Sequence, residues 1–239
     1  MTKVKPYNNL ETKKKQVTKM FDNIAGSYDF LNHTLSLGMD NIWRKIAIKE
    51  LSNKPATILD IATGTADFAI SASKYTNANI TGIDISQGML DVGVEKITKK
   101  GLTNRIQLQL ADSEKLPFQD NSYDAITAGF GVRNFEDLNK GLSEMYRTLK
   151  SGGKVAILEP SEPTNFPLKQ FYNLYFHHIL PFIGGIISKD KNAYTYLPDS
   201  VSAFPSGKDF LTELDKVGFK ESKHIPLTFG IVSLYIAIK

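Results

Sequence analysis

Short apolar segments alternate with longer amphipathic segments through the middle of the chain. A buried strand that is followed each time by a helix is typical of a parallel sheet covered on both faces. The right-handed connections of such a sheet predict a doubly wound α/β fold. The expected strands lie at 58–62, 79–84, 106–111, 123–128 and 153–158, and the expected helices at 66–75, 86–100 and 135–150.

The C-terminal region predicts the last part of the sheet. Two apolar segments, 222–228 and 231–238, flank Phe229-Gly230, which favours an antiparallel hairpin. A helix is expected before them, at 207–217. Seven strands with an antiparallel last strand fit a class I S-adenosylmethionine-dependent methyltransferase better than a six-stranded dehydrogenase.

Helices rather than strands are expected on either side of this core. Residues 11–25 read as a helix that leads into the segment FDNIAGSYDFLNHTLSLGMDNIWRKIAIKEL, whose second half, residues 40–51, reads as another helix. Residues 160–205 are rich in proline and aromatic side chains and read as an irregular helical insertion. We therefore expect one methyltransferase domain over residues 1–239, with a helical N-terminal lid (1–52) and a helical substrate cap (160–205).

The composition excludes several kinds of site. Of the 239 residues, 41% are hydrophobic and 23% are charged, as in an ordinary globular domain. The chain contains no cysteine, so disulfides, thiolate zinc sites and cysteine nucleophiles are excluded. The apolar run at 179–187 contains a proline and two glycines and is too short to span a bilayer. Because the N-terminal segment also lacks an apolar signal core, we expect a soluble, cytoplasmic protein.

The net charge of +4 leaves more than one interpretation open. The lysines of the N-terminal segment could favour an anionic membrane surface or nucleic acid, or they could form a solvated face. The chain has no arginine-rich run and no aromatic-plus-basic motif, so we expect no nucleic-acid partner. Together with the apolar insertion, the charge favours a peripheral contact with the inner face of the cell membrane. The same insertion could also form an ordinary cap or a homodimer interface.

The turn after the first predicted strand is expected to hold a nucleoside. Ligands of doubly wound sheets bind at the carboxyl ends of the strands, where Gly64 begins this turn. A dinucleotide fingerprint needs two further glycines, but Ala66 and Ala69 stand at those positions. Asp60 and Asp67 on either side would repel a pyrophosphate and attract a cation. S-adenosylmethionine carries a sulfonium and an ammonium group, so the turn favours it over a dinucleotide.

Acidic residues after the next two strands fit the rest of the nucleoside. Asp84 lies 20 residues after Gly64, where an acid accepts hydrogen bonds from a ribose diol. This position serves NAD and S-adenosylmethionine alike, and capping of the next helix is its alternative role. Asp112 follows the third strand and can accept the adenine amine, while the backbone N–H of Ser113 can meet a ring nitrogen. These residues predict where the nucleoside binds.

With these motifs in place, the chain resembles the ubiquinone/menaquinone biosynthesis C-methyltransferase family (UbiE/MenG) over nearly its whole length. The more specific segments are Tyr-Asp-x-x-Asn at 28–32, Gly-x-Arg-Asn at 131–134 and Glu-Pro-Ser at 159–161. Other similar segments are FDNIAGSYDFLN, LSLGMDNIWRK, ILDIATGTADF, GIDISQGML, LADSEKLPFQDNSYDAI, GFGVRNFED, MYRTLKSGGKVAILEPSEP and FPSGKDFLTELDKVGF. The Gly-Thr-Ala-Asp turn is more similar to the menaquinone branch than to the ubiquinone branch.

Three positions depart from the family pattern. Asp40, which we expect to cap a helix at 40–51, stands where the family often has His, so no imidazole chemistry is expected there. Gly129 stands where many members have a Ser that contacts the cofactor, so it is left out of the expected site. Ser151 replaces a common Pro, which should affect only a turn.

The resemblance implies both a cofactor site and a reaction. With the first turn included, the expected cofactor-binding residues are Thr65, Asp84, Asp112, Ser113, Gly64 and Asp60. The implied reaction transfers the methyl group of S-adenosylmethionine to a ring carbon of demethylmenaquinol, a prenylated quinol whose tail needs an apolar groove. A benzoquinol of the ubiquinone pathway, or the substrate of another small-molecule methyltransferase, is the alternative. An NAD-dependent oxidoreductase and a non-catalytic binding protein fit less well.

Residues beside the expected cofactor site are candidates for catalysis. An aromatic carbon is a poor nucleophile, so the enzyme must align the reactants and stabilise a phenolate formed from the quinol. Arg133 and Asn134 follow the fourth strand and can hold an oxyanion or orient a water molecule. Tyr28 and Asp29 lie in the N-terminal lid, as catalytic groups or as lid structure alone. The four histidines lack metal-binding spacing, so we expect no metal.

Overall fold

The computed structural model describes residues 4–51, 54–163, 165–174 and 191–239. The strands are β1 (Thr57–Ile61), β2 (Asn79–Asp84), β3 (Ile106–Leu110), β4 (Tyr123–Gly129), β5 (Leu149–Pro160), β6 (Lys220–Leu227) and β7 (Val232–Ile238). The α-helices are α1 (Lys13–Leu35), α2 (Met39–Glu50), α3 (Asp67–Tyr75), α4 (Gln87–Lys99), α5 (Leu138–Thr148), α6 (Leu168–Leu174), α8 (Lys191–Ala203) and α9 (Lys208–Val217). Short 3₁₀ helices among the described residues include η1 (Val132–Asn134) and η3 (Thr228–Gly230).

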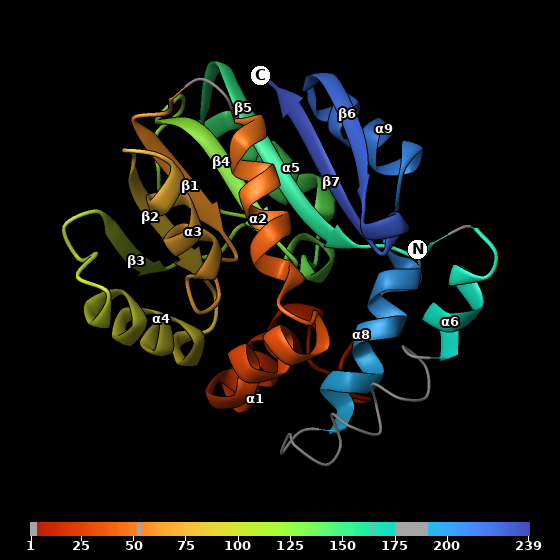
Figure 1. The fold of residues 1–239 in the computed structure, drawn as a ribbon. Coiled ribbons are helices and arrows are strands. Elements are labelled where there is room, and N and C mark those ends of the chain that lie inside the picture. Colours follow the sequence, from red (N-terminus) through yellow and green to blue (C-terminus); the bar gives the residue numbers. More distant parts are fainter. Residues whose placement is uncertain (1–3, 52–53, 164, 175–190) are drawn as a thin grey trace.

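The strands form one seven-stranded sheet in the order β3-β2-β1-β4-β5-β7-β6 (Figure 1). Strand β1 pairs in parallel with β2 and β4, and β5 continues the parallel part beside β4. Strand β7 runs antiparallel to both β5 and β6. The predicted doubly wound sheet and its antiparallel last strand are therefore confirmed.

The two faces of the sheet bury two separate apolar clusters. Successive strand residues point to opposite faces, so Ile58 of β1 belongs to one cluster and Leu59 to the other. The first cluster contains side chains of α2, α3 and α4, and the second contains side chains of α5 and α9. Both faces of β1 are covered, because its residues 58–61 are all buried. Such an apolar strand is expected at the centre of a parallel sheet.

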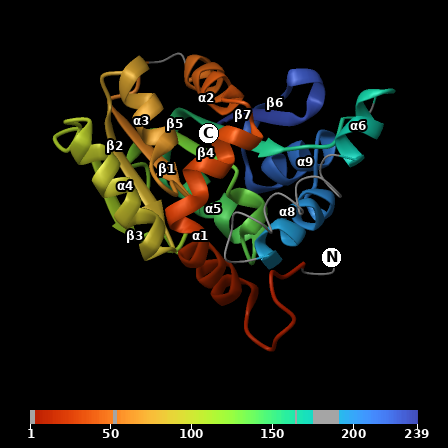
Figure 2. The same ribbon diagram turned by 60° about the horizontal axis from the view of Figure 1, so that its bottom comes forward.

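Helices α1 and α8 cover the end of the sheet at which the parallel strands finish. In Figure 1 both lie below the sheet, and in Figure 2, where the bottom is turned forward, both lie in front of it. A third apolar cluster joins them. Its buried members are Val17, Met20, Ile24, Ala25, Met89 and Tyr196. The two helices therefore pack together where ligands of doubly wound folds bind.

The N-terminal helices differ from the prediction in their limits. Helix α1 begins after Thr12, whose hydroxyl accepts a hydrogen bond from the Lys15 N–H, and it continues beyond the predicted end to Leu35. The expected cap at Asp40 is wrong, because the N-cap of α2 is Gly38 and Asp40 lies in the first turn of the helix. Asp40 is instead buried and paired with Arg44, one turn further along.

The bounds of other elements also differ from the predicted ones. Helix α5 is shorter than predicted, and β5 begins at Leu149, directly after the helix. The expected insertion at 160–205 contains α6 and α8 where it is described. The apolar run at 179–187 lies outside the described residues. Among the helices that are described, none is long and apolar enough to cross a membrane.

Candidate active site

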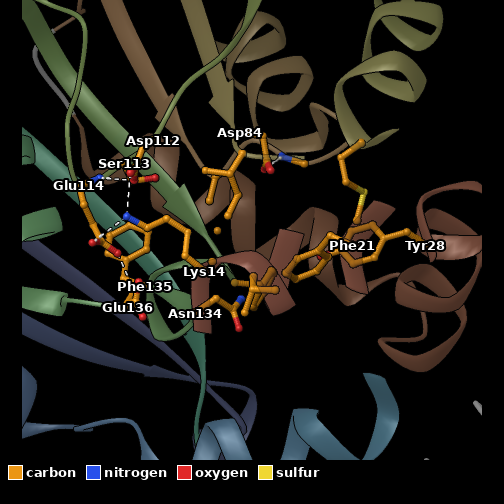
Figure 3. Close-up of a pocket in the computed structure, with 18 residues that line it drawn as sticks. Lys14, Phe21, Tyr28, Asp84, Asp112, Ser113, Glu114, Asn134, Phe135 and Glu136 are labelled. Atoms are coloured by element: carbon orange, nitrogen blue, oxygen red, sulfur yellow. Dashed lines mark hydrogen bonds and ion pairs between the residues drawn. The ribbon is translucent and has the colours of Figure 1, made fainter. Parts of the chain in front are cut away.

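A pocket lies where β1, β2 and β4 end, between the sheet and α1 (Figure 3). Six of the predicted site residues contribute to its wall, namely Tyr28, Gly64, Asp84, Asp112, Ser113 and Asn134. The other lining residues are Lys14, Val17, Phe21, Ala62, Ile85, Met89, Glu114, Gly129, Phe130, Gly131, Phe135 and Glu136. The fold therefore brings together residues that are more than a hundred positions apart in the chain.

The turn after β1 is built from residues in the left-handed region. Ala62, Gly64 and Ala66 have φ angles of 52°, 55° and 67°. Only glycine adopts this region without steric cost, so the two alanines carry strain of about 1–2 kcal/mol each. A side chain at Gly64 would meet no atom within 4 Å, whereas Ala66 is fully buried beside Gly93 of α4. Gly64 thus leaves its space open to a ligand, and Ala66 packs against a helix.

Asp84 connects this turn to the end of β2. Its carboxylate accepts hydrogen bonds from the backbone N–H groups of Gly64 and Ser86, each at 2.9 Å. Burial raises the pKa of Asp84, although these backbone donors oppose that shift. The next helix is capped by Ser86, whose hydroxyl accepts from the Met89 N–H at 3.2 Å. The remaining oxygen lone pairs of Asp84 are therefore available to a ligand diol.

Asp112 and Ser113 lie across the pocket from Asp84 (Figure 3). Lys14 of α1 forms ion pairs with Asp112 at 2.7 Å and with Glu114 at 3.0 Å. Burial lowers the pKa of Lys14, but hydrogen bonds to the two carboxylates outweigh burial and the net shift is upward. The N-terminal end of α1 is therefore bound to the loop predicted to hold adenine.

Thr65 and Asp60 are not among the lining residues. The Thr65 hydroxyl donates to Asp29 of α1 and accepts a hydrogen bond from Lys96 of α4 at 3.2 Å. Asp60 is fully buried beneath the turn and accepts a hydrogen bond from Thr127 at 2.7 Å. Burial raises its pKa to about 6. Both residues support the turn from behind, and their predicted cofactor contacts stay predictions.

Of the three predicted catalytic residues, Tyr28 and Asn134 line the pocket and Arg133 does not. Burial raises the pKa of the Tyr28 hydroxyl, so this group stays protonated at neutral pH and can donate. The ring of Tyr28 packs edge-on against Phe21 with centroids 6.0 Å apart. Asn134 is buried and receives a hydrogen bond from the Tyr196 hydroxyl at 3.0 Å.

Arg133 is absent from the pocket lining and pairs with Glu159 in β5. Their closest atoms, Arg133 Nη1 and Glu159 Oε2, are 2.9 Å apart, and both side chains are buried. Glu159 also accepts the backbone N–H of Val132 at 2.6 Å, and Arg133 donates to Ser200 of α8 at 3.3 Å. Burial raises the pKa of Glu159, and the positive charge of Arg133 opposes that shift. This pair holds η1 against β5.

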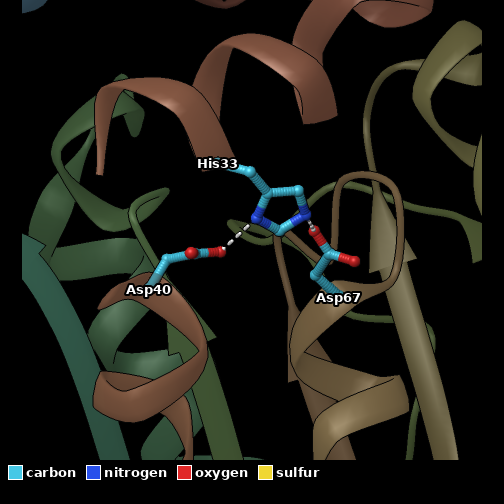
Figure 4. A group of neighbouring side chains, drawn as sticks. All are labelled: His33, Asp40 and Asp67. Atoms are coloured by element: carbon cyan, nitrogen blue, oxygen red, sulfur yellow. Dashed lines mark ion pairs between the residues drawn. The ribbon is translucent and has the colours of Figure 1, made fainter. Parts of the chain in front are cut away.

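A second charged network connects α1, α2 and α3 (Figure 4). His33 lies between Asp40 and Asp67, at 2.8 Å and 3.5 Å from their carboxylates. Three potential metal-ligand atoms of these residues lie within 4.8 Å of one another. Arg44 pairs with Asp40, however, and Lys96 pairs with Asp67, so the carboxylates already have cationic partners. Burial opposes ionisation of Asp40, but Arg44 outweighs it and lowers the pKa of Asp40.

Several residues of the site were missed by reasoning from the sequence. Long-range contacts, which no local sequence pattern predicts, bring three of them to the pocket region: Lys14, Glu114 and Tyr196. The position of Glu159 could have predicted a buried ion pair, since an acid at the end of an apolar strand is rarely buried without a partner. The partner itself, Arg133, was assigned to the substrate instead.

The lining residues fit S-adenosylmethionine. Among the described lining residues, four carry acids (Asp84, Asp112, Glu114 and Glu136) and Lys14 is the only lysine or arginine. This balance suits a ligand with sulfonium and ammonium charges and disfavours a pyrophosphate. Apolar side chains of α1 and α4 provide walls for a planar base. The fold and this pocket together define a class I methyltransferase that uses S-adenosylmethionine.

Comparison with known proteins agrees with this class. The profile of the ubiE/COQ5 methyltransferase family matches residues 9–239. The chain belongs to the ubiE/COQ5 methyltransferase family, and the predicted resemblance is confirmed. A demethylmenaquinone methyltransferase of Bacteroides fragilis is 50% identical, over 99% of this chain and 98% of the relative. The ubiquinone/menaquinone biosynthesis C-methyltransferase UbiE of Geotalea daltonii is 46% identical, over 96% and 99%.

Solved structures share the fold. Phosphoethanolamine N-methyltransferase 2 of Haemonchus contortus, in complex with S-adenosylmethionine, has a TM-score of 0.60 and 19% sequence identity. The similarity covers 82% of this chain and 52% of that one. At this level of identity the comparison shows a common architecture and leaves the methyl acceptor open.

Proposed function

We propose that the chain methylates a ring carbon of demethylmenaquinol to give menaquinol. The observation that carries this proposal is the full-length similarity to the Bacteroides fragilis enzyme, at 50% identity over 99% of this chain. The Gly-Thr-Ala-Asp turn, which forms part of the site, supports the menaquinone branch. The acidic pocket supports the methyl donor, and the apolar side chains of α1 and α8 support an apolar acceptor.

In the proposed reaction, a carbon–methyl bond forms as the sulfur–methyl bond breaks with its electron pair on sulfur, and the ring proton leaves to solvent. The chain aligns the two reactants and stabilises negative charge on the quinol oxygen. Tyr28 supplies a hydroxyl donor at this wall, because its raised pKa keeps it protonated. Arg133 acts through Glu159 by holding η1 in place.

The proposed division into lid, core and cap follows the arrangement of the helices. Residues 1–52 form the lid, whose α1 contacts the pocket through Lys14 and Tyr28. Residues 160–205 form the substrate cap, whose α8 reaches η1 through Ser200 and Tyr196. The prenyl tail passes toward this cap. All of these parts belong to one methyltransferase domain over residues 1–239.

A methyl-transfer assay with labelled S-adenosylmethionine tests the function. Chemically reduced demethylmenaquinol should become labelled on the ring, and the oxidised quinone should not, because only the quinol can form the electron-rich phenolate. A demethylated benzoquinol of the ubiquinone pathway is run beside it, since the Geotalea daltonii relative is named for both pathways. Labelling of the benzoquinol alone would move the assignment to the ubiquinone branch. Cofactor binding without labelling of either quinol would refute a quinol substrate.

We propose in addition a peripheral contact with the inner face of the cell membrane. Phe30 in the C-terminal part of α1 and Leu37 just after the helix are 62% and 88% exposed, and the net charge of +4 attracts anionic lipid. Vesicles with phosphatidylglycerol should retain the protein at low salt and release it at high salt, whereas pure phosphatidylcholine vesicles should not. A homodimer is the other use of this apolar surface. A doubled mass in light scattering, without vesicle binding, would favour the dimer.

A further inference from the structure

Asn134 presents an unpaired hydrogen-bond donor to the pocket. Its side chain is buried, with 7% of the residue exposed, and its amide nitrogen Nδ2 has no hydrogen-bond partner among the described residues. The same residue lines the pocket beside Gly131 and Phe135. A buried N–H group without an acceptor is energetically unfavourable, and an acceptor on a bound ligand would remove this cost. The nitrogen is therefore placed for a ligand oxygen.

The other end of the Asn134 amide is held by the substrate cap. The hydroxyl of Tyr196 in α8 donates to Asn134 Oδ1 at 3.0 Å. In Figure 3 the oxygen of Asn134 is turned away from the other lining side chains and its nitrogen is turned toward them. Because a hydroxyl proton needs an acceptor, this bond favours the orientation with oxygen toward Tyr196 and nitrogen toward the pocket.

The Tyr196 ring is itself held in place. It is 4% exposed and belongs to the apolar cluster that joins α8 to Val17, Met20 and Ile24 of α1. Burial raises the pKa of the Tyr196 hydroxyl to about 12, so this group is a donor throughout the neutral range. A protonated hydroxyl on a packed ring is suited to fix a neighbouring amide.

We propose that Tyr196 is a positioning residue that orients Asn134, so that Asn134 Nδ2 donates a hydrogen bond to the quinol oxygen that gains negative charge during methyl transfer. The donor is neutral and preorganised, as in an oxyanion hole. The Arg133 guanidinium, by contrast, is already paired with Glu159 and Ser200, and Arg133 is not among the lining residues. The inference rests on the proposed function, since it names the atom of that quinol that Asn134 meets.

The test is a double-mutant cycle on methyl transfer to demethylmenaquinol. Asn134→Ala should lower kcat about 100-fold, the typical effect of losing one oxyanion donor. Tyr196→Phe keeps the ring and should lower kcat about 10-fold. The double variant should be no slower than Asn134→Ala, because Tyr196 acts through Asn134. In each variant the KM for the quinol and the Kd for S-adenosylhomocysteine should stay within about 3-fold of wild type. The inference would be overturned if the fold-losses in kcat of the two single variants multiplied in the double variant. An unchanged kcat in Tyr196→Phe would also overturn it.

Two further variants separate positioning from packing. Tyr146→Phe removes a hydroxyl from a tyrosine that packs edge-on against Phe219, away from the pocket, and should leave kcat unchanged. Asn134→Asp keeps an acceptor for Tyr196 but replaces the amide donor with a second acceptor, so it should be as slow as Asn134→Ala. Wild-type activity in Asn134→Asp would show that the pocket meets an acceptor, and would refute the proposed orientation.

A ligand-free measurement keeps the inference distinct from the proposed function. The same four proteins of the cycle are unfolded in urea without cofactor or quinol. If the change in unfolding free energy of the double variant differs from the sum of the two single changes, the Tyr196–Asn134 bond is supported. If the changes add, the bond is refuted. If the wild type methylates no quinol, the proposed function fails, and this unfolding cycle alone decides whether Tyr196 holds Asn134.

Discussion

At the scale of single residues, Asp84 connects two parts of the predicted cofactor site, the turn after β1 and the start of α4. Its carboxylate is buried and accepts backbone N–H groups from the turn after β1 and from the start of α4. The Asp84 carboxylate therefore fixes the position of both segments. A ribose diol would add its own hydrogen bonds to the same oxygens.

Replacing Asp84 by Asn should weaken cofactor binding. The amide has one acceptor oxygen in place of two, and hydrogen bonds to a charged acceptor contribute about 1.5–3 kcal/mol each. The Kd for S-adenosylhomocysteine should rise about 10- to 100-fold in calorimetry. Asp91→Asn, on the exposed side of α4, is the matched control and should bind like the wild type. Equal affinities in both variants would contradict the ribose role.

Asp60 should make stability depend on pH. Its pKa in the folded protein is raised to about 6 by burial, above the ordinary value of 3.8. The folded state therefore binds more protons than the unfolded state between these values, and stability falls as pH rises from about 4 to 6. The contribution is about 3 kcal/mol, because one unit of pKa corresponds to about 1.4 kcal/mol.

Asp60→Asn isolates this effect. Urea unfolding of both proteins at pH 4.5 and pH 7 should show that the variant gains stability relative to the wild type at the higher pH. Asn keeps an oxygen for the Thr127 hydroxyl, which donates to Asp60 in the wild type. A difference between the two proteins that does not change with pH would show that Asp60 is not the titrating group.

At the scale of elements, the close approach of η1 to the end of β1 shapes the pocket. A methyl group at Gly131 would lie 2.4 Å from Cβ of Ala62, so the two backbones meet where a side chain cannot fit. The pair of Arg133 and Glu159 holds η1 in this place from the other side. Asn134, at the end of η1, depends on both contacts for its position.

Gly131→Ala should therefore destabilise the fold and the site together. Overpacking of this kind costs about 1–3 kcal/mol, because Ala62 can move only with its backbone. Gly26→Ala in α1 is the control, since a methyl group there meets no atom within 4 Å. That variant should be more stable than the wild type by about 0.5–1 kcal/mol, because alanine favours the helix. Thermal unfolding and cofactor binding of the two variants measure the difference.

The elements were predictable where the pattern is local, and less so where it depends on the tertiary structure. Alternation of apolar strands with helices was sufficient for the sheet, and the predicted acids at the end of β2 and after β3 line the pocket. The supposed cap at Asp40 was wrong because a buried arginine, not the helix end, uses its carboxylate. Arg133 followed the right strand, but its direction depends on Glu159, 26 residues away.

At the scale of the whole molecule, the lid and the sheet enclose the cofactor site jointly. Lys14 binds the loop after β3, Asp29 binds the turn after β1, and Asp22 accepts the Ser86 hydroxyl at 2.6 Å. These contacts are spread over most of the length of α1. Opening of this helix is therefore expected to expose the pocket, and a bound cofactor should oppose opening.

S-adenosylhomocysteine should protect the lid against trypsin. At a concentration of 100 times Kd, the ligand should raise the free energy of unfolding by about 2.7 kcal/mol. Cleavage after the lysines of α1 should slow in parallel, which mass spectrometry of the N-terminal fragments measures. A protein that is stabilised globally while α1 is cleaved at an unchanged rate would show that the lid opens independently of the ligand.

The position of β7 has a consequence for synthesis. This strand lies between β5 and β6, although it is made after both. Until residues 232–238 leave the ribosome, the edge of β5 has no partner and β6 has no sheet to join. An unpaired apolar edge is a template for association with other chains. The nascent protein is therefore expected to expose this strand edge late in synthesis, long after the cofactor-binding half has been made.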